Sequence, residues 1–168
     1  MPKIIENLEA RLIEEAARQI EEVGYGAMTI RSVAAGCSVG IGTVYNYFPS
    51  KDDLLATYML LDWNQCIAAI QAVSDVSATP EPVLRSIHDQ LLQYAARHKS
   101  IFQDAAAATA FAGSFSRYHE RLRSQLSKPL RKFCESDFSA DFISESLLTW
   151  TMAGKSFGEI YSLIAKLL

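Results

Sequence analysis

The stretch SVGIGTVYNYFPSKDDLL, residues 38–55, holds the side chains of this sequence that are best suited to contact a ligand. Its Gly40 and Gly42 form a Gly-x-Gly pair, which can open a loop that cradles phosphate groups. Tyr45 and Tyr47 follow two residues apart, and a Phe-Pro-Ser-Lys run comes next. Such residues suit three structures: a nucleotide site, a turn between buried helices, or a surface that holds a larger molecule.

The nucleotide site fails on two requirements. A dinucleotide-binding loop needs a strand before its first glycine and a third glycine three residues after its second. The residue three positions after Gly42 is Tyr45, and the residues before the loop have a helical pattern. The other two structures therefore remain.

The sequence in and before this stretch predicts three helices. Residues 4–24 place apolar side chains at steps of three and four, which is typical of an amphipathic helix. Gly24 is suited to end it, and Thr29 has the chemistry of an N-cap for a helix over residues 29–36. A tight break separates that helix from another over about residues 40–47. This pattern predicts a helix-turn-helix, whose second helix enters the DNA major groove while the first crosses the backbone.

The remainder of the chain is also predicted to be helical. Ser50 and Asp53 form a near capping box at the start of a long helix that reaches about residue 73. No apolar pattern of period two extends over five residues, so the fold class is all-α. We expect further helices, with a break at SDFSAD (136–141), over 82–97, over 111–133 with a bend near Pro129, and over 141–168 with a split at Gly154 or Gly158.

Composition limits the partners that this chain can have. Its 168 residues carry a net charge of -3, and residues 1–54 alone hold five Lys or Arg against eight Asp or Glu. Binding to an acidic polymer must therefore depend on a few well-placed groups. No apolar run approaches the ~20 residues of a membrane span, and the first residues are too charged for a signal peptide. We expect a cytoplasmic protein without a membrane partner.

Nothing in the sequence supports catalysis or metal binding. The three cysteines are scattered and form no Cys-x-x-Cys pair. His88, His98 and His119 have no partners at metal-ligand spacing. Motifs of serine hydrolases, zinc proteases and P-loop proteins do not occur. We therefore expect no catalytic residue, no metal and no cofactor, and we predict that the protein is not an enzyme.

The sequence TIRSVAAGCSVGIGTVYNYFPSKDDLL resembles the DNA-binding motif of the TetR-type transcriptional regulators. The matching features are Thr29-Ile30-Arg31, Ala34, Val39, Gly42-Thr43, Tyr45-x-Tyr47-Phe48, Ser50-Lys51 and Leu54-Leu55. The resemblance is specific over about residues 4–55, and beyond them it extends only to helix count and order. It implies an all-helical homodimer: an N-terminal three-helix helix-turn-helix domain (1–50) joined by a long helix to a C-terminal ligand-binding and dimerisation domain (51–168).

The resemblance also implies the contacts to double-stranded DNA. Phosphate contacts carry over to Thr29, Thr43, Tyr47 and Lys51. Base-edge contacts carry over to Ile41, Gly42, Tyr45 and Asn46, although Asn46 could equally solvate the helix end. We include Arg31 in the DNA-binding set, while a surface charge or an ion pair with a glutamate of the first helix explains it equally well.

Two positions depart from the resembled family. Ser38 stands where the family usually has a turn glycine, so we expect a slightly different turn. Ile41 stands where the family often has a polar or basic residue. An isoleucine cannot donate a hydrogen bond to a base, but it can pack on a thymine methyl group, so direct readout is expected to be sparse.

The region after the motif carries aromatic side chains on several predicted helices. Core packing explains any one of them, whereas the set suits a cavity for an apolar or aromatic small molecule, with a cationic one also compatible. Residues 141–168 are more apolar than one helix needs, which predicts a four-helix interface in a homodimer. The predicted ligand-binding residues are Trp63, Tyr94, His98, Phe102, Phe111, Phe115 and Trp150.

Together these features predict a ligand-responsive transcriptional regulator. In this hypothesis a repressor binds a palindromic operator and is released by a small apolar or aromatic effector. The alternative is a helical small-molecule-binding protein, or an enzyme, that has the same fold without operator binding. The acidic balance of residues 1–54 and the apolar Ile41 favour the alternative, and the set Thr43, Tyr45, Tyr47 and Lys51 favours the regulator more strongly.

Overall fold

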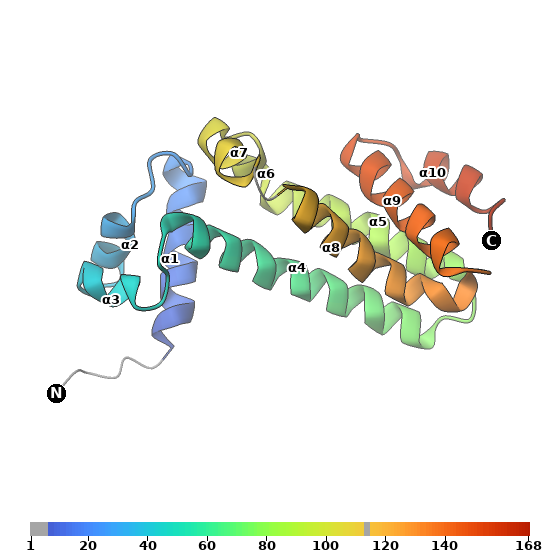
Figure 1. Cartoon of the computed structure of the whole chain (residues 1–168), viewed down its shortest axis with the longest axis horizontal. Coiled ribbons are helices and arrows are strands. Elements are labelled where there is room, and N and C mark those ends of the chain that lie inside the picture. Colours follow the sequence, from blue (N-terminus) through green and yellow to red (C-terminus); the bar gives the residue numbers. More distant parts are fainter. Residues whose placement is uncertain (1–6, 113–114) are drawn as a thin grey trace. The chain divides into compact units, whose positions relative to one another are not determined.

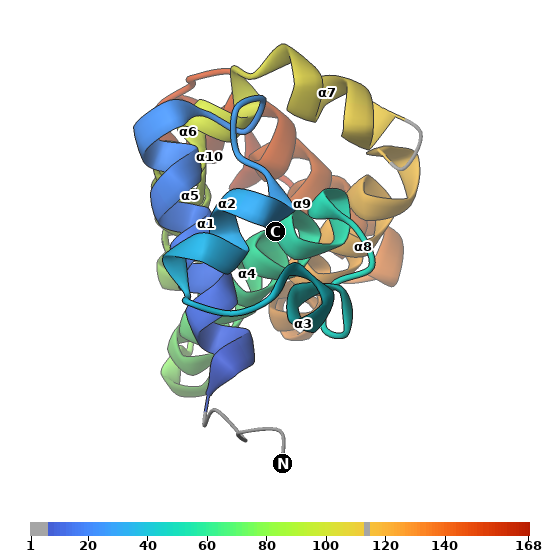
Figure 2. The same cartoon turned by 90° about the vertical axis from the view of Figure 1, so that its left-hand side faces the viewer.

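The computed structural model describes residues 7–112 and 115–168, with side chains described at 7–109 and 120–168. All regular elements within these ranges are helices, as the coiled ribbons of Figures 1 and 2 show, and the expected all-α class is confirmed. Within the described ranges, no helix has both the length and the apolar character that crossing a membrane requires.

The helices follow the predicted order, and some boundaries differ. Their bounds are α1 Leu8–Val23, α2 Ile30–Gly36, α3 Ile41–Tyr45, α4 Lys51–Val76, α5 Pro80–Arg97, α6 Lys99–Phe102, α7 Ala105–Ala112, α8 Phe115–Ser127, a 3-10 helix over Lys128–Phe133, α9 Asp137–Met152 and α10 Phe157–Ile164.

Two expectations for the second half of the chain need correction. Of the predicted helix 111–133, residues 111–112 belong to α7 and residues 115–127 to α8, and residues 113 and 114 lie outside the described residues. Beside Pro129 the chain does not bend as one helix but continues as a 3-10 helix. The expected break at 136–141 is the start of α9, because the Ser136 hydroxyl accepts a hydrogen bond from the Ser139 N–H and caps it.

The predicted split near the C-terminal end lies at Gly154. This glycine follows α9 with a φ of 83°, a left-handed conformation that glycine adopts at little cost. Gly158, the other expected position, lies inside α10. The two glycines of this region therefore have different structural roles, and only the first ends a helix.

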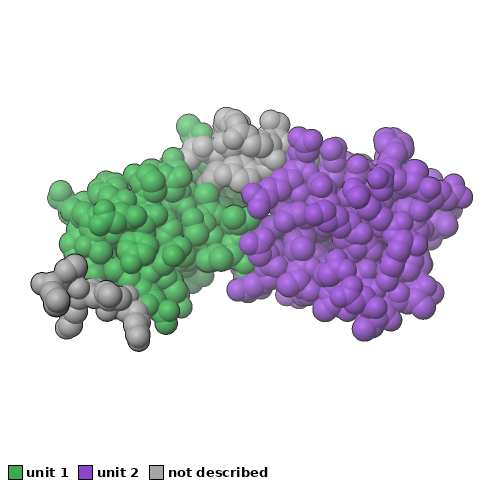
Figure 3. Space-filling view, turned by 60° about the horizontal axis from the view of Figure 1, so that its bottom comes forward, with its two compact units in different colours: residues 1–62, 98–112 green, residues 63–97, 113–168 purple. Residues whose placement is uncertain are grey.

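The described chain packs as two compact units, coloured separately in Figure 3. Unit 1 comprises the described residues of 1–62 and 98–112, and unit 2 those of 63–97 and 113–168. The long helix α4 contributes its first residues to unit 1 and the others to unit 2. These packing units differ from the expected functional domains, 1–50 and 51–168, because the start of α4 and the segment 98–112 pack with the helix-turn-helix.

The core of unit 1 joins α1, α2 and α3 to the start of α4 and to the segment 98–112. Figures 1 and 2 both place α2 beside α3, and these two helices are in contact. Each fully buried Val, Leu, Ile or Met side chain of this core stabilises the fold by roughly 1.5–3 kcal/mol relative to exposure. Its members include Leu12, Ala16, Met28, Val33, Val44, Leu54, Leu55, Ile101 and Ala107.

The core of unit 2 lies among α5, α8, α9, α10, the 3-10 helix and the second part of α4. Polar contacts fasten the end of α4 there: the Ser74 hydroxyl donates to the Pro129 carbonyl, and the Lys132 ammonium donates to the Ser74 and Ser77 carbonyls. A cation at the C-terminal end of a helix also interacts favourably with the helix dipole. The fully buried apolar residues include Ile70, Leu84, Ile87, Leu126, Leu130, Ile143 and Leu147.

Candidate nucleic-acid interface

The orientation of α3 follows from two buried side chains. Val44 is fully buried and Phe48 is 3% exposed, so both point into the core of unit 1, as their spacing predicts. The neighbouring positions must then face outward. Ile41 is 41% exposed, Tyr45 49% and Tyr47 44%, and Gly42 and Asn46 are also exposed. Ile41, Gly42, Tyr45 and Asn46 thus share the outward side of α3 and its C-cap, and Tyr47 is exposed just beyond the helix.

The turn before α3 is closed by a Schellman motif. The Ser38 N–H donates to the Ala35 carbonyl at 3.0 Å, and the Val39 N–H donates to the Ala34 carbonyl at 3.0 Å. Ser38 has a φ of 57°, so it adopts the left-handed conformation that usually belongs to glycine. The turn therefore has the geometry that a glycine would give it. The serine that replaces the family's usual glycine strains the backbone but does not change the shape of the turn.

The start of α2 is fixed by a reciprocal cap. The Thr29 hydroxyl accepts a hydrogen bond from the Ser32 N–H at 3.0 Å, and the Ser32 hydroxyl accepts one from the Thr29 N–H at 3.1 Å. The prediction that Thr29 caps this helix is confirmed. The Ser32 hydroxyl also donates to the Gln19 side chain, which connects the cap to α1.

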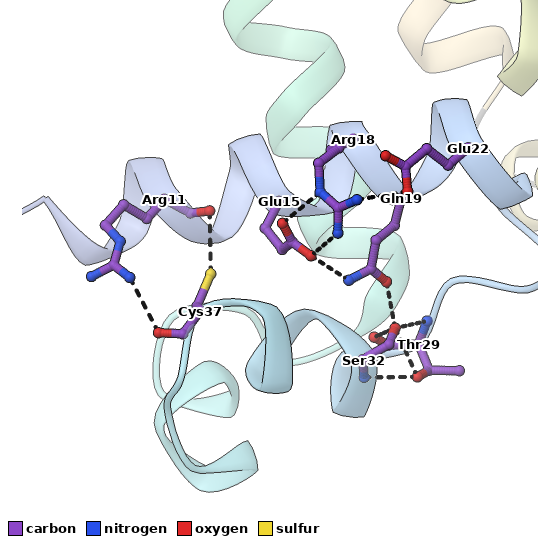
Figure 4. A network of polar contacts seen from close by, with 8 residues as sticks. All are labelled: Arg11, Glu15, Arg18, Gln19, Glu22, Thr29, Ser32 and Cys37. Carbon is purple, nitrogen blue, oxygen red and sulfur yellow. Dashed lines mark hydrogen bonds and ion pairs between the residues drawn. The ribbon is translucent and has the colours of Figure 1, made fainter.

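Figure 4 shows how α1 holds the helix-turn-helix through polar contacts. The Glu15 carboxylate accepts from Arg18 at 2.6 Å and from Gln19 at 2.7 Å. These hydrogen bonds, that from Arg18 foremost, lower the pKa of Glu15 to about 2. At the other end of α2, Arg11 donates to the Cys37 carbonyl at 3.2 Å, and the Cys37 thiol donates to the Arg11 carbonyl at 3.4 Å.

Two glycines of this region differ in what surrounds them. A Cβ added at Gly36 would lie 2.1 Å from Glu15 Oε1, so the absence of a side chain there makes room for the polar contacts of α1. A Cβ added at Gly42 would meet nothing within 4 Å. Gly42 also has no left-handed φ. The fold accounts for Gly36 but gives no reason for Gly42, which destabilises a helix by about 1 kcal/mol relative to alanine.

Lys51 makes its contacts within unit 1. Its ammonium lies 4.1 Å from the centre of the Tyr25 ring and 3.4 Å from the Gly26 carbonyl oxygen. Partial burial lowers the pKa of Lys51. Tyr25 is buried and donates its hydroxyl hydrogen bond to Asp52, and burial foremost raises the pKa of Tyr25. Lys51 and Tyr25 thus connect the start of α4 to the turn between α1 and α2.

A third contact to this turn comes from Asp104. Its carboxylate accepts from the Gly26 N–H at 3.0 Å and, as the N-cap of α7, from the N–H groups of Ala106 and Ala107. The hydrogen bond from Gly26 is the main reason that the pKa of Asp104 is lowered. Sequence reasoning missed this residue, although an aspartate directly before AAAATAFA is a recognisable N-cap signal.

The remaining members of the predicted DNA-binding set also lie on unit 1. Thr43 is half-buried beside the exposed residues of α3, and Arg31 is exposed on the first turn of α2. Arg18, by contrast, is engaged by Glu15 and Glu22, each at 2.6 Å, so its charge is largely matched within the unit. The structure therefore places all the predicted DNA-binding residues in unit 1, and only two of them, Arg31 and Lys51, carry a positive charge.

The predicted effector residues whose side chains the structure describes are divided between the two units. In unit 2, Trp63 is buried, contacts Tyr94 edge-to-face at 5.3 Å between ring centres, and donates to the Gln125 side chain at 2.8 Å. Trp150 is 52% exposed. Phe111 and Phe115 lie outside the residues whose side chains the structure describes.

The other two predicted effector residues belong to unit 1. His98 is fully buried, with Nε2 2.8 Å from the Asp62 carboxylate, and its ring contacts those of Tyr58 and Phe102. Phe102 is 48% exposed. A groove of about 460 Å³ on the same unit is lined by other residues, among them Leu8, Ile13, Tyr47 and Leu61.

Within the part of the chain that the structure describes, no group of three or more His, Cys, Asp or Glu side chains gathers as metal ligands would.

Comparison with known proteins gives a consistent result for the N-terminal part. Residues 12–58 match the family model described as bacterial regulatory proteins, tetR family. The HTH-type transcriptional repressor KstR2 of Mycobacterium tuberculosis is 29% identical over an alignment of 119 residues, and the match covers 68% of this chain and 58% of that protein. The HTH-type transcriptional regulator HbdR of Aromatoleum sp. is 37% identical over 54 residues, 32% of this chain and 24% of that protein.

The chain therefore spans less than two thirds of the length of these curated relatives. Solved structures of similar fold cover more of it. AlkX from Dietzia sp., a TetR family repressor implicated in n-alkane biodegradation, covers 94% of this chain and 98% of its own, with a TM-score of 0.66 and 15% identity. FadR from Bacillus subtilis in complex with stearoyl-CoA covers 94% and 96%, with a TM-score of 0.55 and 18% identity. At these identities the likeness concerns the fold alone.

Proposed function

We propose that this chain, a member of the TetR-type transcriptional regulators, is a ligand-responsive repressor that binds a palindromic operator and leaves it when a small apolar or aromatic molecule binds. The exposed outer face of α3 is the observation that carries this proposal. The buried pair Val44 and Phe48 directs that face outward, while the Schellman turn and the Thr29 cap hold α3 and α2 in place. The proposal includes a cytoplasmic location, because the operator DNA of a bacterial regulator lies there.

The DNA contacts follow the exposed residues of unit 1. We assign base-edge contacts to Ile41, Gly42, Tyr45 and Asn46, which share the outer face of α3. Gly42 supports this assignment. The fold has room for a side chain at this position, so packing does not require a glycine, whereas a backbone without a side chain would allow a close approach of DNA.

Contacts to phosphates are assigned to Thr29, Arg31, Thr43, Tyr47 and Lys51. Lys51 has a double role in this proposal. One of its three ammonium N–H groups is directed to the Gly26 carbonyl, and the others remain available to a phosphate oxygen. Its contact with Tyr25 then positions the charge at the start of α4.

A second copy of the chain completes the proposed repressor. Large apolar side chains remain exposed on α9 and α10: Phe138, Phe142, Trp150, Met152 and Leu163. Packing this surface against its two-fold mate would remove it from water and pair two helix-turn-helix motifs. Two such motifs would contact half-sites whose centres lie about 35 Å apart, one helical turn of DNA, or a multiple of it.

The effector site is proposed in the helical region that follows the DNA-binding motif. Trp63 and Tyr94, which pack edge-to-face, are the two predicted residues that the structure brings together in unit 2. The presence of stearoyl-CoA in the FadR structure supports an effector with a long apolar part. His98, Phe102, Phe111, Phe115 and Trp150 remain proposed contributors.

One observation favours a second candidate function. Residues 1–54 have more acidic than basic side chains, and Arg18 is neutralised by two glutamates. A helical small-molecule-binding protein that does not bind an operator would have no need of a basic surface.

A gel shift separates the two functions. The full chain is titrated against duplexes covering the DNA that flanks its coding gene, with a duplex of unrelated sequence as competitor. We expect one flanking duplex to be retained specifically, and Tyr47→Phe with Lys51→Ala to weaken binding to all duplexes alike. Equal, weak binding to every duplex would contradict the repressor and leave the second candidate.

A further inference from the structure

The outer face of α3 lacks the side chains that read most base pairs. Residues 40–47 are GIGTVYNY and include no Arg, Lys, Gln, Asp or Glu. Arginine and lysine make the commonest specific contacts with guanine, and acidic side chains accept a hydrogen bond from the amino group of cytosine. Large exposed apolar groups occur there instead, and two of them, Ile41 and Tyr45, lie one turn apart on the same side of the helix.

The surroundings of Ile41 leave its side chain accessible. An exposed isoleucine alone carries no meaning, because single apolar residues are common on protein surfaces. Ile41, however, stands between Gly40 and Gly42, so neither neighbour in the chain has a side chain to shield it. It is also outside the buried core of unit 1, although it belongs to a helix whose Val44 is fully buried. Packing within the unit therefore does not account for this side chain.

We infer that Ile41 recognises a thymine in each operator half-site by packing against its 5-methyl group. This inference rests on the proposed function, because it needs α3 in the major groove. The 5-methyl group is the apolar feature that thymine presents there, and cytosine and the purines offer none. Bare backbone at Gly42 lets the base edge approach closely enough for contact with the isoleucine.

The expected effect is set by one buried methyl group. Removing the methyl group from one half-site should weaken binding about fourfold, and removing it from both should weaken binding about fifteenfold. The specificity would then depend on apolar contact, which salt does not screen, rather than on the few cations of unit 1.

The experiment uses duplexes that differ only by methyl groups. The full chain first selects its preferred sequence from a random duplex library, and each thymine of that sequence is then replaced singly by deoxyuridine. We expect one thymine position in each half-site at which deoxyuridine weakens binding about fourfold. A selected duplex in which every deoxyuridine replacement is neutral would overturn the inference and leave operator binding intact.

Variants assign the effect to Ile41. In Ile41→Ala, the thymine and deoxyuridine duplexes should bind equally well, while Ile41→Val should keep most of the difference. Val23→Ala is the matched control, because Val23 is a 59% exposed aliphatic residue of the same unit at the end of α1. Circular dichroism melting checks that the variants are folded. Discrimination that persists in Ile41→Ala would overturn the inference, whereas a library that yields no preferred sequence would overturn the proposed function as well.

Discussion

The outer faces of α3 and α9 both expose large apolar side chains, but they are built differently. The face of α3 combines Ile41 and Tyr45 with the bare backbone of Gly42, so little side-chain volume covers the helix. The face of α9 carries Phe138 and Phe142, whose ring centres lie 6.5 Å apart, with Met152 further along. A thin face suits a partner that approaches the backbone, and a bulky face suits one that buries large side chains.

The means by which each helix is held also differ. The five-residue α3 is too short to be stable alone, and its position depends on the turn before it and on Val44 and Phe48 behind it. The sixteen-residue α9 buries a full row of side chains against the rest of unit 2. Small changes near α3 should therefore alter function at constant fold, whereas changes on the outer face of α9 should alter assembly.

The largest effect is expected from a charge on the α9 face. Phe142→Asp places like charges opposite one another in the proposed two-fold interface, where they would be desolvated. We expect a monomer in analytical ultracentrifugation at micromolar concentration and a loss of operator affinity of about 100-fold or more, because one half-site contact is lost. Leu92→Asp, at a 44% exposed position on α5, is the control and should leave both unchanged. A dimeric Phe142→Asp protein would show that the α9 face does not meet a second copy.

A smaller effect is expected at Gly42, where one substitution should raise the stability of the fold and lower the affinity for the operator. Gly42→Ala should raise the free energy of unfolding by about 0.5–1 kcal/mol, because alanine favours helix and its Cβ has open space. The same change should weaken operator binding about tenfold by blocking close approach. Urea denaturation and DNA titration measure the two quantities.

Two other glycines provide controls for Gly42. Gly158→Ala, in α10 and also in open space, should raise stability without changing DNA affinity. Gly36→Ala should lower stability by about 1–2 kcal/mol, because its Cβ would displace Glu15 from its hydrogen bonds. Unchanged operator affinity in Gly42→Ala would contradict the proposal that DNA approaches the backbone closely at Gly42.

The smallest effect is expected at the turn. Ser38→Gly should raise the free energy of unfolding by about 0.4–1 kcal/mol, because the native φ of 57° strains a serine and not a glycine. Because the turn geometry is already that of a glycine turn, operator affinity should change by less than twofold. A destabilised Ser38→Gly protein in the same urea titration would mean that the serine side chain has a stabilising contact at this turn.

Several local features could be read from the sequence because their causes lie within a few residues. The amphipathic spacing of α1, the cap at Thr29 and the stop at Gly24 were all predicted, and the Gly24 N–H closes the helix on the Ile20 carbonyl. Val44 and Phe48 are also one helical turn apart in the sequence, a spacing that directs both side chains to the same side. Such features depend on helix period and on backbone hydrogen bonds between near neighbours.

Other features were decided by contacts between distant parts of the chain. The segment 98–112 follows α5 of unit 2, yet Ile101 and Ala107 enter the core of unit 1, and Asp104 binds Gly26 across 78 residues. Likewise, Trp63 meets Gln125 across 62 residues. Helical periodicity says that a side chain is on an apolar face, but it does not say which other face covers it.

The sequence by itself therefore determined the all-α class, the helix-turn-helix and the outward residues of α3. Only the tertiary structure decided that Lys51 lies against Tyr25, that His98 and Trp63 belong to different units, and that Gly36 makes room for Glu15 whereas Gly42 faces open space. The physical reason is range: backbone hydrogen bonds and caps act between near neighbours, while burial depends on which distant surfaces pack together.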